Sequence, residues 1–367
     1  MILKKIHPER AIRSAARQSR RRAMQAAARM SCRRGILGFL FLVALIAATV
    51  WIVCYRGTAT LRTAQGPIFG TYYTVKYESA QPLDSAILSE LRQVDASLSV
   101  FNQLSTLSKI NTGASTRTDA MLYEVVDKAQ AISRVTNGAF DITVMPLVNA
   151  WGFGFKKGNF PTEAQIDSIR QLIGYERIRL TADSLLLKND PRVMVDCGAI
   201  AKGYGVDRVA RVLREHGVRN FMVEIGGEVI TKGRNPNGNP WQIAVSRPTA
   251  NADSTAQNQF QTVLSLENAA LATSGNYRNF YVHEGRKYAH TIDPRTGRPV
   301  QHSLLSATVI APDCATADAY ATAFMVMGLD EACKVLDAQK QLKAYLIYTD
   351  EQGNLLTKEV RMPKAGK

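Results

Sequence analysis

The spacing of apolar residues along the chain predicts a mixture of helices and strands. Apolar residues recur at helical spacing in Ser85–Leu98, Asp119–Thr136 and Ala201–His216. Runs of aromatic and β-branched residues predict strands at Thr71–Tyr77 and Phe221–Ile225. Further strands are expected at residues 178–180, 185–188, 193–195, 241–245, 262–266, 270–273, 288–292, 305–310 and 345–349, and further helices at 161–172, 316–327 and 330–336. Helices and strands do not alternate strictly, so the pattern favours an α+β fold over a doubly wound sheet.

The N-terminal part has a different pattern. Ile36–Val53 is uncharged and apolar, and about 18 to 20 such residues can span the roughly 30 Å core of a bilayer as a helix. Arg33 and Arg34 precede it, so the positive-inside rule leaves the N-terminus in the cytoplasm. We therefore expect an inner-membrane anchor with the body on the outer, periplasmic side. A cleaved signal peptide and lipid attachment at Cys54 remain alternatives.

Charge is distributed unevenly between the tail and the body. The formal net charge is +15, but residues 1–34 hold eleven Lys and Arg against one acidic residue, Glu9. The remainder is only mildly basic, so we expect no nucleic-acid partner. The domain organisation that follows is a basic cytoplasmic tail (1–35), a transmembrane or signal segment (36–55), a linker (56–65) and one large domain (66–362).

The segment DCGAIAKGYGVD, Asp196–Asp207, predicts an anion-binding loop. Its glycines allow the backbone to approach a ligand closely. A helix begins near Ala201, so the N–H groups of its first turn and the ammonium of Lys202 can face an anion. A plain strand-to-helix connection with glycine turns is the alternative.

The segment Cys314–Gly328 predicts a cation site. Asp318 and Thr322 are four residues apart, so they share one face of a helix that is otherwise Ala, Met, Phe and Val. Burying a carboxylate and a hydroxyl in such surroundings is costly unless a partner compensates. Mg²⁺ prefers oxygen ligands of this kind. The alternative is that Asp318 interacts with the helix dipole and Thr322 bonds back to its own helix.

Two further segments contain candidate functional residues. His290 lies in a predicted strand just before a turn, and it becomes a proton acceptor if it points at a substrate. Otherwise it is a half-buried histidine with one hydrogen bond. Gly138–Gly154 surrounds Asp141 with small and aromatic residues, which suits either a planar ring ligand or an aromatic corner of the core.

Taken together, these segments resemble the family of FAD:protein FMN transferases, and the resemblance covers Gly66–Met362. The motifs follow one another in the family's order: FGTYY, LSVFN, GAFDITVMPLVNAWGFG, VDCGAIAKGYGVD, FMVEIGGEV, TSGNYRNFY, HTIDPRTGRPV and ADAYATAFMVMG. The resemblance implies an α+β fold of mixed, largely antiparallel sheets and helices around a flavin-binding cleft that holds FAD and Mg²⁺. It also implies that the FMN half of FAD is joined through its phosphate to a Thr or Ser of an acceptor flavoprotein, such as a subunit of a membrane redox complex, and that AMP is released.

The resemblance further implies the roles of individual residues. Asp318 and Thr322 are the side-chain ligands of the metal, Ala199 gives it a backbone carbonyl, and Ala321 contributes backbone nearby. His290 matches a histidine that assists catalysis, and Phe101 an aromatic residue that packs on the flavin ring. The implied FAD-contacting positions are Phe69, Phe101, Ala139, Phe140, Asp141, Asp196, Lys202 and Ile292. Two other functions stay open from the sequence: a hydrolase that splits FAD into FMN and AMP, and a flavin-binding module without catalysis.

Overall fold

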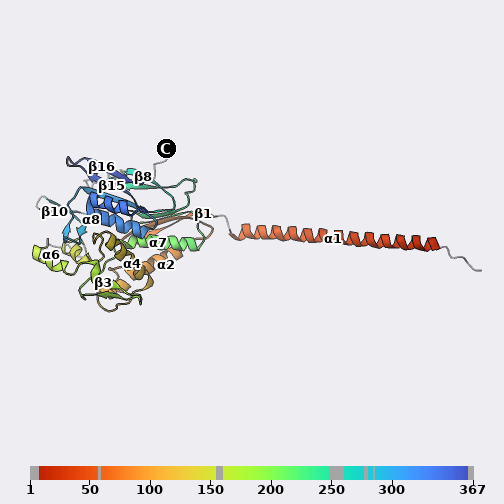
Figure 1. Cartoon of the computed structure of the whole chain (residues 1–367), viewed down its shortest axis with the longest axis horizontal. Helices are drawn as coiled ribbons and strands as arrows, with labels where there is room; N and C mark the ends of the chain where they lie inside the picture. Colours follow the sequence, from red (N-terminus) through yellow and green to blue (C-terminus); the bar gives the residue numbers. More distant parts are fainter. Residues whose placement is uncertain are drawn as a thin grey trace, which may run out of the picture. The chain divides into compact units, whose positions relative to one another are not determined.

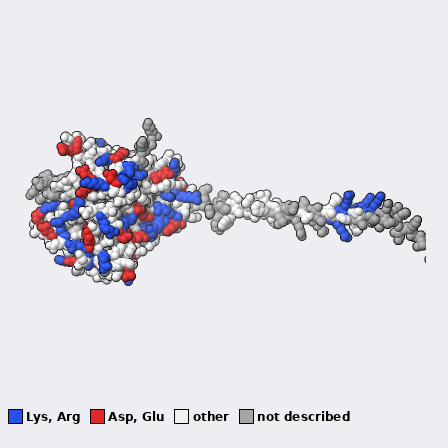
Figure 2. Space-filling model, viewed as in Figure 1, with Lys and Arg blue, Asp and Glu red and all other residues white. Residues whose placement is uncertain are grey.

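The computed structural model describes residues 8–56, 59–153, 160–247, 260–276, 280–283 and 286–362. The chain divides into two units, one ending at Ala59 and the other beginning at Thr60. The described part of the first unit contains one long helix, α1 (Pro8–Arg56; Figure 1). Several basic side chains of α1 are exposed to solvent (Figure 2): Arg13, Arg17, Arg20, Arg21 and Arg22.

The membrane-spanning helix predicted at residues 36–53 is not supported by the structure. This stretch is helical as part of α1. Among the described residues, however, no helix combines the length and the apolar character needed to cross a bilayer.

The second unit is built on an eight-stranded sheet in which every neighbouring pair is antiparallel. The strand order across the sheet is β1–β2–β5–β6–β9–β14–β15–β16. This confirms the predicted α+β fold with a largely antiparallel sheet. The strands are β1 (Thr60–Ile68), β2 (Thr71–Ser79), β5 (Phe221–Ile225), β6 (Glu228–Lys232), β9 (Ala270–Gly275), β14 (Leu304–Ala311), β15 (Lys343–Thr349) and β16 (Leu355–Val360).

Four short two-stranded pairs complete the strands of the described residues. They are β3 (Ile178–Leu180) with β4 (Leu186–Lys188), β7 (Trp241–Ser246) with β8 (Phe260–Leu266), β10 (Phe280–His283) with β11 (Arg286–Ala289), and β12 (Ile292–Asp293) with β13 (Arg298–Pro299).

Two helices, α7 (Ala201–Glu215) and α8 (Cys314–Ala338), pack against each other and against the sheet. Helix α7 contacts β5 and β6, whereas α8 contacts β6, β9, β14 and β15. Helix α2 (Asp84–Leu98) covers α7, and α4 (Ala120–Val135) contacts α8, so these helices form an outer layer on the same side (Figure 1). Shorter helices are α3 (Thr106–Asn111), α5 (Met145–Ala150) and α6 (Glu163–Arg170), with one 3₁₀ turn at Tyr175–Arg177.

The two faces of the sheet bury different partners because successive side chains of a strand point to opposite faces. In β14, Ala307 and Val309 belong to the core beneath α8, whereas Ile310 belongs to a smaller core with the β7–β8 pair. In β9, Ala272 belongs to the core beneath α8 and Leu271 to the smaller core. Strands β9 and β14 are therefore covered on both sides, and apolar residues occur on both of their faces.

Several predicted element boundaries are wrong. Residues 60–65, predicted as the end of a linker, form the first part of β1 and pair with β2. The strand predicted through His290 is interrupted there, so His290 lies between β11 and β12. The break predicted between the helices at 316–327 and 330–336 is confirmed, however, because α8 has non-helical backbone at Gly328, whose φ of 77° is accessible to glycine at little cost.

The strand predicted at Val193–Val195 is also wrong. The backbone of Val195 is bonded to the side chain of Asn111 instead of to a neighbouring strand. The amide of Asn111 donates to the carbonyl of Val195 at 2.8 Å and accepts from its N–H at 2.8 Å. A side chain thus supplies the hydrogen bonds that a neighbouring strand would have supplied. The next residue, Asp196, donates its N–H to the carbonyl of Ile142 at 2.7 Å. Asn111 therefore holds the chain just before the predicted anion-binding loop.

Replacing Asn111 with alanine should lower the free energy of unfolding by about 1–3 kcal/mol, because both backbone groups of Val195 lose their partner in buried surroundings. Urea unfolding of the two proteins measures the difference. Asn237→Ala, at an exposed turn, is the matched control and should change little. Equal losses in the two variants would contradict the role assigned to Asn111.

Candidate active site

The main cavity lies where strands β6 and β9 stop pairing. These two strands are hydrogen-bonded only around Val229–Leu271 and Ile230–Ala270. Beyond this point Glu228 begins β6, whereas Thr273–Gly275 continue β9, and both line a cavity of about 550 Å³. The gap admits side chains from the helices on one face of the sheet and from β7 on the other.

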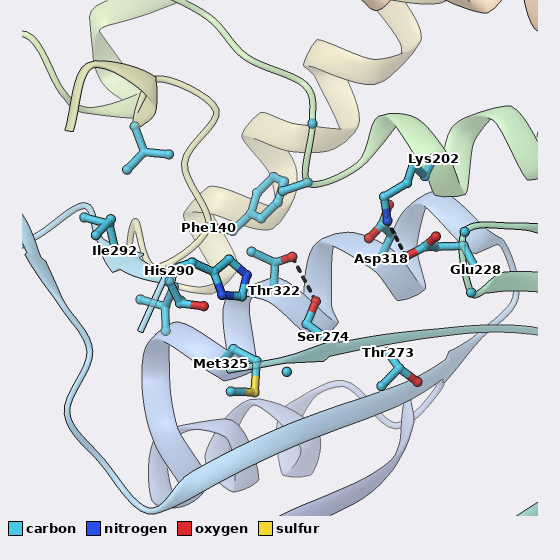
Figure 3. A pocket seen from close by; sticks show the side chains of 18 of the residues that line it. Phe140, Lys202, Glu228, Thr273, Ser274, His290, Ile292, Asp318, Thr322 and Met325 are labelled. Carbon is cyan, nitrogen blue, oxygen red and sulfur yellow. Dashed lines mark hydrogen bonds and ion pairs between the residues drawn. The ribbon is translucent and has the colours of Figure 1, made fainter. Parts of the chain in front are cut away.

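One wall of the cavity holds three charged side chains that point toward one another (Figure 3). Lys202, in the first turn of α7, forms an ion pair with Glu228, with 2.5 Å between Nζ and Oε1. Asp318 of α8 accepts a hydrogen bond from the backbone N–H of Gly203 at 3.1 Å. The side chain of Glu228 is only 4% exposed and Asp318 is buried, so two carboxylates lie away from bulk water beside one ammonium group that pairs with Glu228.

Burial and the mutual repulsion of these carboxylates change their proton affinities. Burial, followed by the charge of Asp318, raises the pKa of Glu228 to about 8, although Lys202 opposes the change. Burial also raises the pKa of Asp318, against the effects of Lys202 and the Gly203 N–H. Burial alone would lower the pKa of Lys202, but Asp318 and Glu228 outweigh it and the pKa is raised. Gathering these charges is therefore unfavourable without a further partner, and either a proton or a bound cation would relieve the repulsion between the carboxylates.

Helix α8 presents the two residues that the sequence predicted as cation ligands. Asp318 and Thr322 both line the cavity, and the Thr322 hydroxyl lies 3.3 Å from the hydroxyl of Ser274 (Figure 3). Ala199 lines the cavity as well, just before α7. Ala321 is fully buried and does not line it, so its contribution would be limited to backbone.

The residues present fit a hard cation. The Oε2 atom of Glu228 is buried without a hydrogen-bond partner, which leaves one oxygen atom at this place for a further ligand. Among the described residues, no three His, Cys, Asp or Glu side chains are grouped as a metal site. A cation here would therefore need oxygen atoms from hydroxyl groups, backbone carbonyls and a ligand in addition to Asp318, a mixture typical of Mg²⁺ sites.

The opposite wall comes from the segments around Phe140 and His290. Ala139, Phe140, Asp141, His290 and Ile292 all line the cavity. Asp141 accepts hydrogen bonds from the N–H and the hydroxyl of Thr143 at 2.7 and 2.6 Å, and burial raises its pKa to about 6. The ring of His290 has an edge contact with Phe153, with 6.4 Å between the ring centres.

A second cavity of about 240 Å³ adjoins the first across the Asp196–Lys202 loop. Asp196, Gly198 and Lys202 line both cavities. Phe69 and Phe101 line the second one, and Phe101 is 79% exposed. Burial raises the pKa of Asp196, although the Gly198 N–H donates to its carboxylate at 2.9 Å.

The turn between β1 and β2 holds Phe69 at the second cavity. Ile68 pairs with Thr71, so the β1–β2 connection has two residues, Phe69 and Gly70, both with positive φ (51° and 72°). This is typical of a tight hairpin, but a positive φ is unfavourable for phenylalanine. The ring packs against Gly205 of α7, where an added Cβ would lie 2.7 Å from it.

The structure thus brings most of the predicted site residues together. Two neighbouring cavities contain all of them except Ala321. The roles of these residues as ligands and catalyst stay predictions.

Sequence reasoning missed Glu228 and Ser274. The motif FMVEIGGEV contained a signal for Glu228. Two glycines directly before an acidic residue leave space beside the backbone for its side chain to reach a cavity, and Gly226 and Gly227 do line the first cavity.

The antiparallel sheet has a cavity lined by a lysine, buried carboxylates and a histidine, which is typical of an enzyme with an α+β fold. The sequence profile of the ApbE family matches residues 69–346. A curated relative from Haemophilus influenzae, named FAD:protein FMN transferase, is 37% identical over 328 residues, which is 85% of this chain and 93% of the relative. The chain belongs to the ApbE family.

Solved structures agree with this assignment. The flavin transferase ApbE from Vibrio cholerae superimposes with a TM-score of 0.74 at 35% identity, over 83% of this chain and 98% of that one. The apo form of the flavinyl transferase ApbE from Pseudomonas stutzeri gives a TM-score of 0.73 at 31% identity, over 83% and 96% of the two chains.

The raised pKa of Glu228 predicts a pH dependence of stability. Between its ordinary pKa of 4.5 and about 8, the folded protein keeps a proton that the unfolded chain has lost. Folding therefore binds a proton in this window, and the contribution of Glu228 to the free energy of unfolding falls as pH rises through about 8. Glu228→Gln should flatten this fall. Urea unfolding without flavin or added metal at pH 5, 6.5 and 8 measures it.

The control for this prediction is Glu351→Gln, at an exposed turn, which should keep the pH dependence of the parent protein. A Glu228→Gln protein whose stability falls with pH as steeply as the parent's would refute the buried charge cluster as its cause.

Proposed function

We propose that this chain is an Mg²⁺-dependent FAD:protein FMN transferase. It splits the pyrophosphate of FAD, joins the FMN phosphate to the hydroxyl of a Thr or Ser in an acceptor protein, and releases AMP. The observation that carries the proposal is the meeting of Lys202, Asp318 and Thr322 in one cavity, in a chain whose relatives bear the name of this activity.

The loop before α7 supports the binding of a pyrophosphate. Helix α7 begins after Ile200, and the positive end of its dipole favours an anion at this place. Lys202 adds a positive charge at the same place, and Gly198 leaves room for close approach. In this proposal the phosphate groups lie between this loop and α8.

The acidic cluster supports the role of Mg²⁺. When bound, Mg²⁺ would polarise the phosphate oxygens and offset the charge that develops on them during phosphoryl transfer. Asp318 and Thr322 would hold it with their side chains, and Ala199 with its backbone carbonyl. Lys202 adds a second positive charge toward the same oxygens, while Glu228 holds the ammonium group in place at 2.5 Å.

His290 is the proposed proton acceptor. It lies at the interruption between β11 and β12, in the wall of the cavity that also contains Thr322. In the proposed step, His290 takes the proton of the acceptor hydroxyl while the hydroxyl oxygen attacks the FMN phosphorus. The bond from this phosphorus to the bridging oxygen breaks, and its electrons leave with AMP.

The second cavity is proposed to receive the flavin ring. Phe101 is exposed at this cavity, and Phe69 borders it from the β1–β2 turn. Aromatic side chains stack favourably on planar rings. Because the Asp196–Lys202 loop is shared by both cavities, a dinucleotide could extend from one to the other past Lys202. The remaining positions, Ala139, Phe140, Asp141 and Ile292, would then contact the other half of FAD.

The test uses the purified full chain, FAD, Mg²⁺ and a candidate flavin-accepting protein. The parent protein should produce an acceptor with the mass of an FMN adduct and covalent flavin fluorescence. Asp318→Asn should lower the rate about 100-fold or more, because the transition state loses several kcal/mol of charge stabilisation. Release of AMP at the same rate without any acceptor would favour an FAD hydrolase instead. Bound but unchanged FAD would favour a flavin-binding module.

We further propose that the domain acts on the periplasmic side of the inner membrane, on a subunit of a membrane redox complex. The support is the basic residues that precede the apolar stretch Ile36–Val53. In cells, protease added to spheroplasts should degrade the domain, whereas a cytoplasmic control protein should survive. Protection of the domain until the cells are lysed would refute this location.

A further inference from the structure

Helices α7 and α8 cap each other's N-terminal turns. The carboxylate of Asp207, on α7, accepts hydrogen bonds from the backbone N–H groups of Cys314 at 2.8 Å and Ala315 at 2.9 Å. These are the first two residues of α8. Asp313, the residue just before α8, accepts from the N–H of Thr316 at 2.8 Å. The N–H groups of the first three residues of α8 are therefore all paired, two of them by a side chain from another helix.

The converse contact runs from α8 to α7. Asp318 accepts from the N–H of Gly203, the third residue of α7, at 3.1 Å. The two helices also approach closely at Gly203, because an added Cβ would lie 2.4 Å from the carbonyl oxygen of Cys314. The absence of a side chain at this position lets the two backbones meet.

These contacts match one turn of α7 to one turn of α8. Gly203 and Asp207 are four residues apart, as are Cys314 and Asp318. Asp207 accepts from the N–H of Cys314 at the beginning of this α8 turn, and the N–H of Gly203 donates to Asp318 at its end. Lys202 is adjacent to Gly203, so a shift of α8 along α7 would change the separation of Lys202 from Asp318.

We propose that Asp207 is a positioning residue for the reaction: by fixing the first turn of α8 on α7, it sets where Asp318 and Thr322 stand relative to Lys202. Asp207 does not line either cavity, so it acts only through α8. The inference rests on the proposed FMN transfer, in which Lys202, Asp318 and Thr322 act on the same phosphate groups. A small displacement of such groups is expected to reduce the rate strongly, because aligned contacts carry much of the catalysis.

Asp313 provides a matched control. Like Asp207 it is an aspartate that caps the first turn of α8, and it also pairs with Lys128 of α4 at 3.1 Å. It does not connect α8 to α7, however. If Asp207 only stabilised a helix, Asp207→Asn and Asp313→Asn would have similar consequences. If Asp207 positions α8 on α7, only its replacement changes the site.

The experiment compares the parent full chain with Asp207→Asn, Asp207→Glu and Asp313→Asn. Melting temperature and circular dichroism report the fold. Steady-state FMN transfer gives kcat and the KM for FAD. Binding of Mn²⁺ in the presence of FAD, followed by the loss of the free-ion electron paramagnetic resonance signal, reports the cation site without turnover. Asp207→Glu keeps a charged acceptor but adds one methylene, so it tests the position of α8 even if Asp207→Asn does not fold.

Both Asp207 variants should show a kcat lower by about tenfold or more and weaker Mn²⁺ binding, with a much smaller change in the KM for FAD. Asp313→Asn should lose melting temperature but keep kcat and Mn²⁺ binding near those of the parent. A folded Asp207→Glu protein with parental kcat and Mn²⁺ binding would overturn the inference, as would equal losses in Asp313→Asn. An inactive parent protein would instead count against the proposed function, and Mn²⁺ binding would still test the positioning role.

Discussion

Two buried carboxylates and a partly exposed ammonium group meet where α7, α8 and the start of β6 come together, and much of the surrounding structure holds them there. Charged groups lose hydration when they are buried, so such a cluster persists only where hydrogen bonds and opposite charges compensate. Lys202 compensates Glu228 directly, and the Gly203 N–H compensates Asp318. The raised pKa values of both carboxyl groups are consistent with a site that is completed by a cation and by a phosphate-bearing ligand.

The sheet makes room for this cluster by an interruption of its hydrogen bonding. Strands β6 and β9 pair over two residues, and the cavity begins where they separate. A fully paired sheet would have filled this place with backbone. The helices then approach the gap from one face, with a glycine at their contact, so that the first turn of α7 and the middle of α8 border the cavity. The first turn of a helix carries a partial positive charge, so the beginning of α7, with Lys202, suits an anionic ligand.

Sequence reasoning succeeded where the signal was local. The helical spacing in residues 85–98 and 119–136 and the β-branched runs at 71–77 and 221–225 were confirmed, because one buried face dictates the period of each element. It failed where a distant residue replaced an expected partner. Val193–Val195 looks like a strand, but its hydrogen bonds go to the side chain of Asn111, more than eighty positions away in the sequence. Residues 60–65 looked like a linker because their polar composition hid an edge strand.

The sequence by itself determined the residue types of the site and their local pairing, since Asp318 and Thr322 are one helical turn apart in any α-helix. It also determined the family, through the order of its motifs. Only the tertiary structure decided that Glu228 faces Lys202, that Asp207 caps a helix other than its own, and that the Asp196–Lys202 loop separates two cavities. These facts depend on contacts between segments tens to more than a hundred residues apart, and helical or strand periodicity carries no information about which distant segments meet.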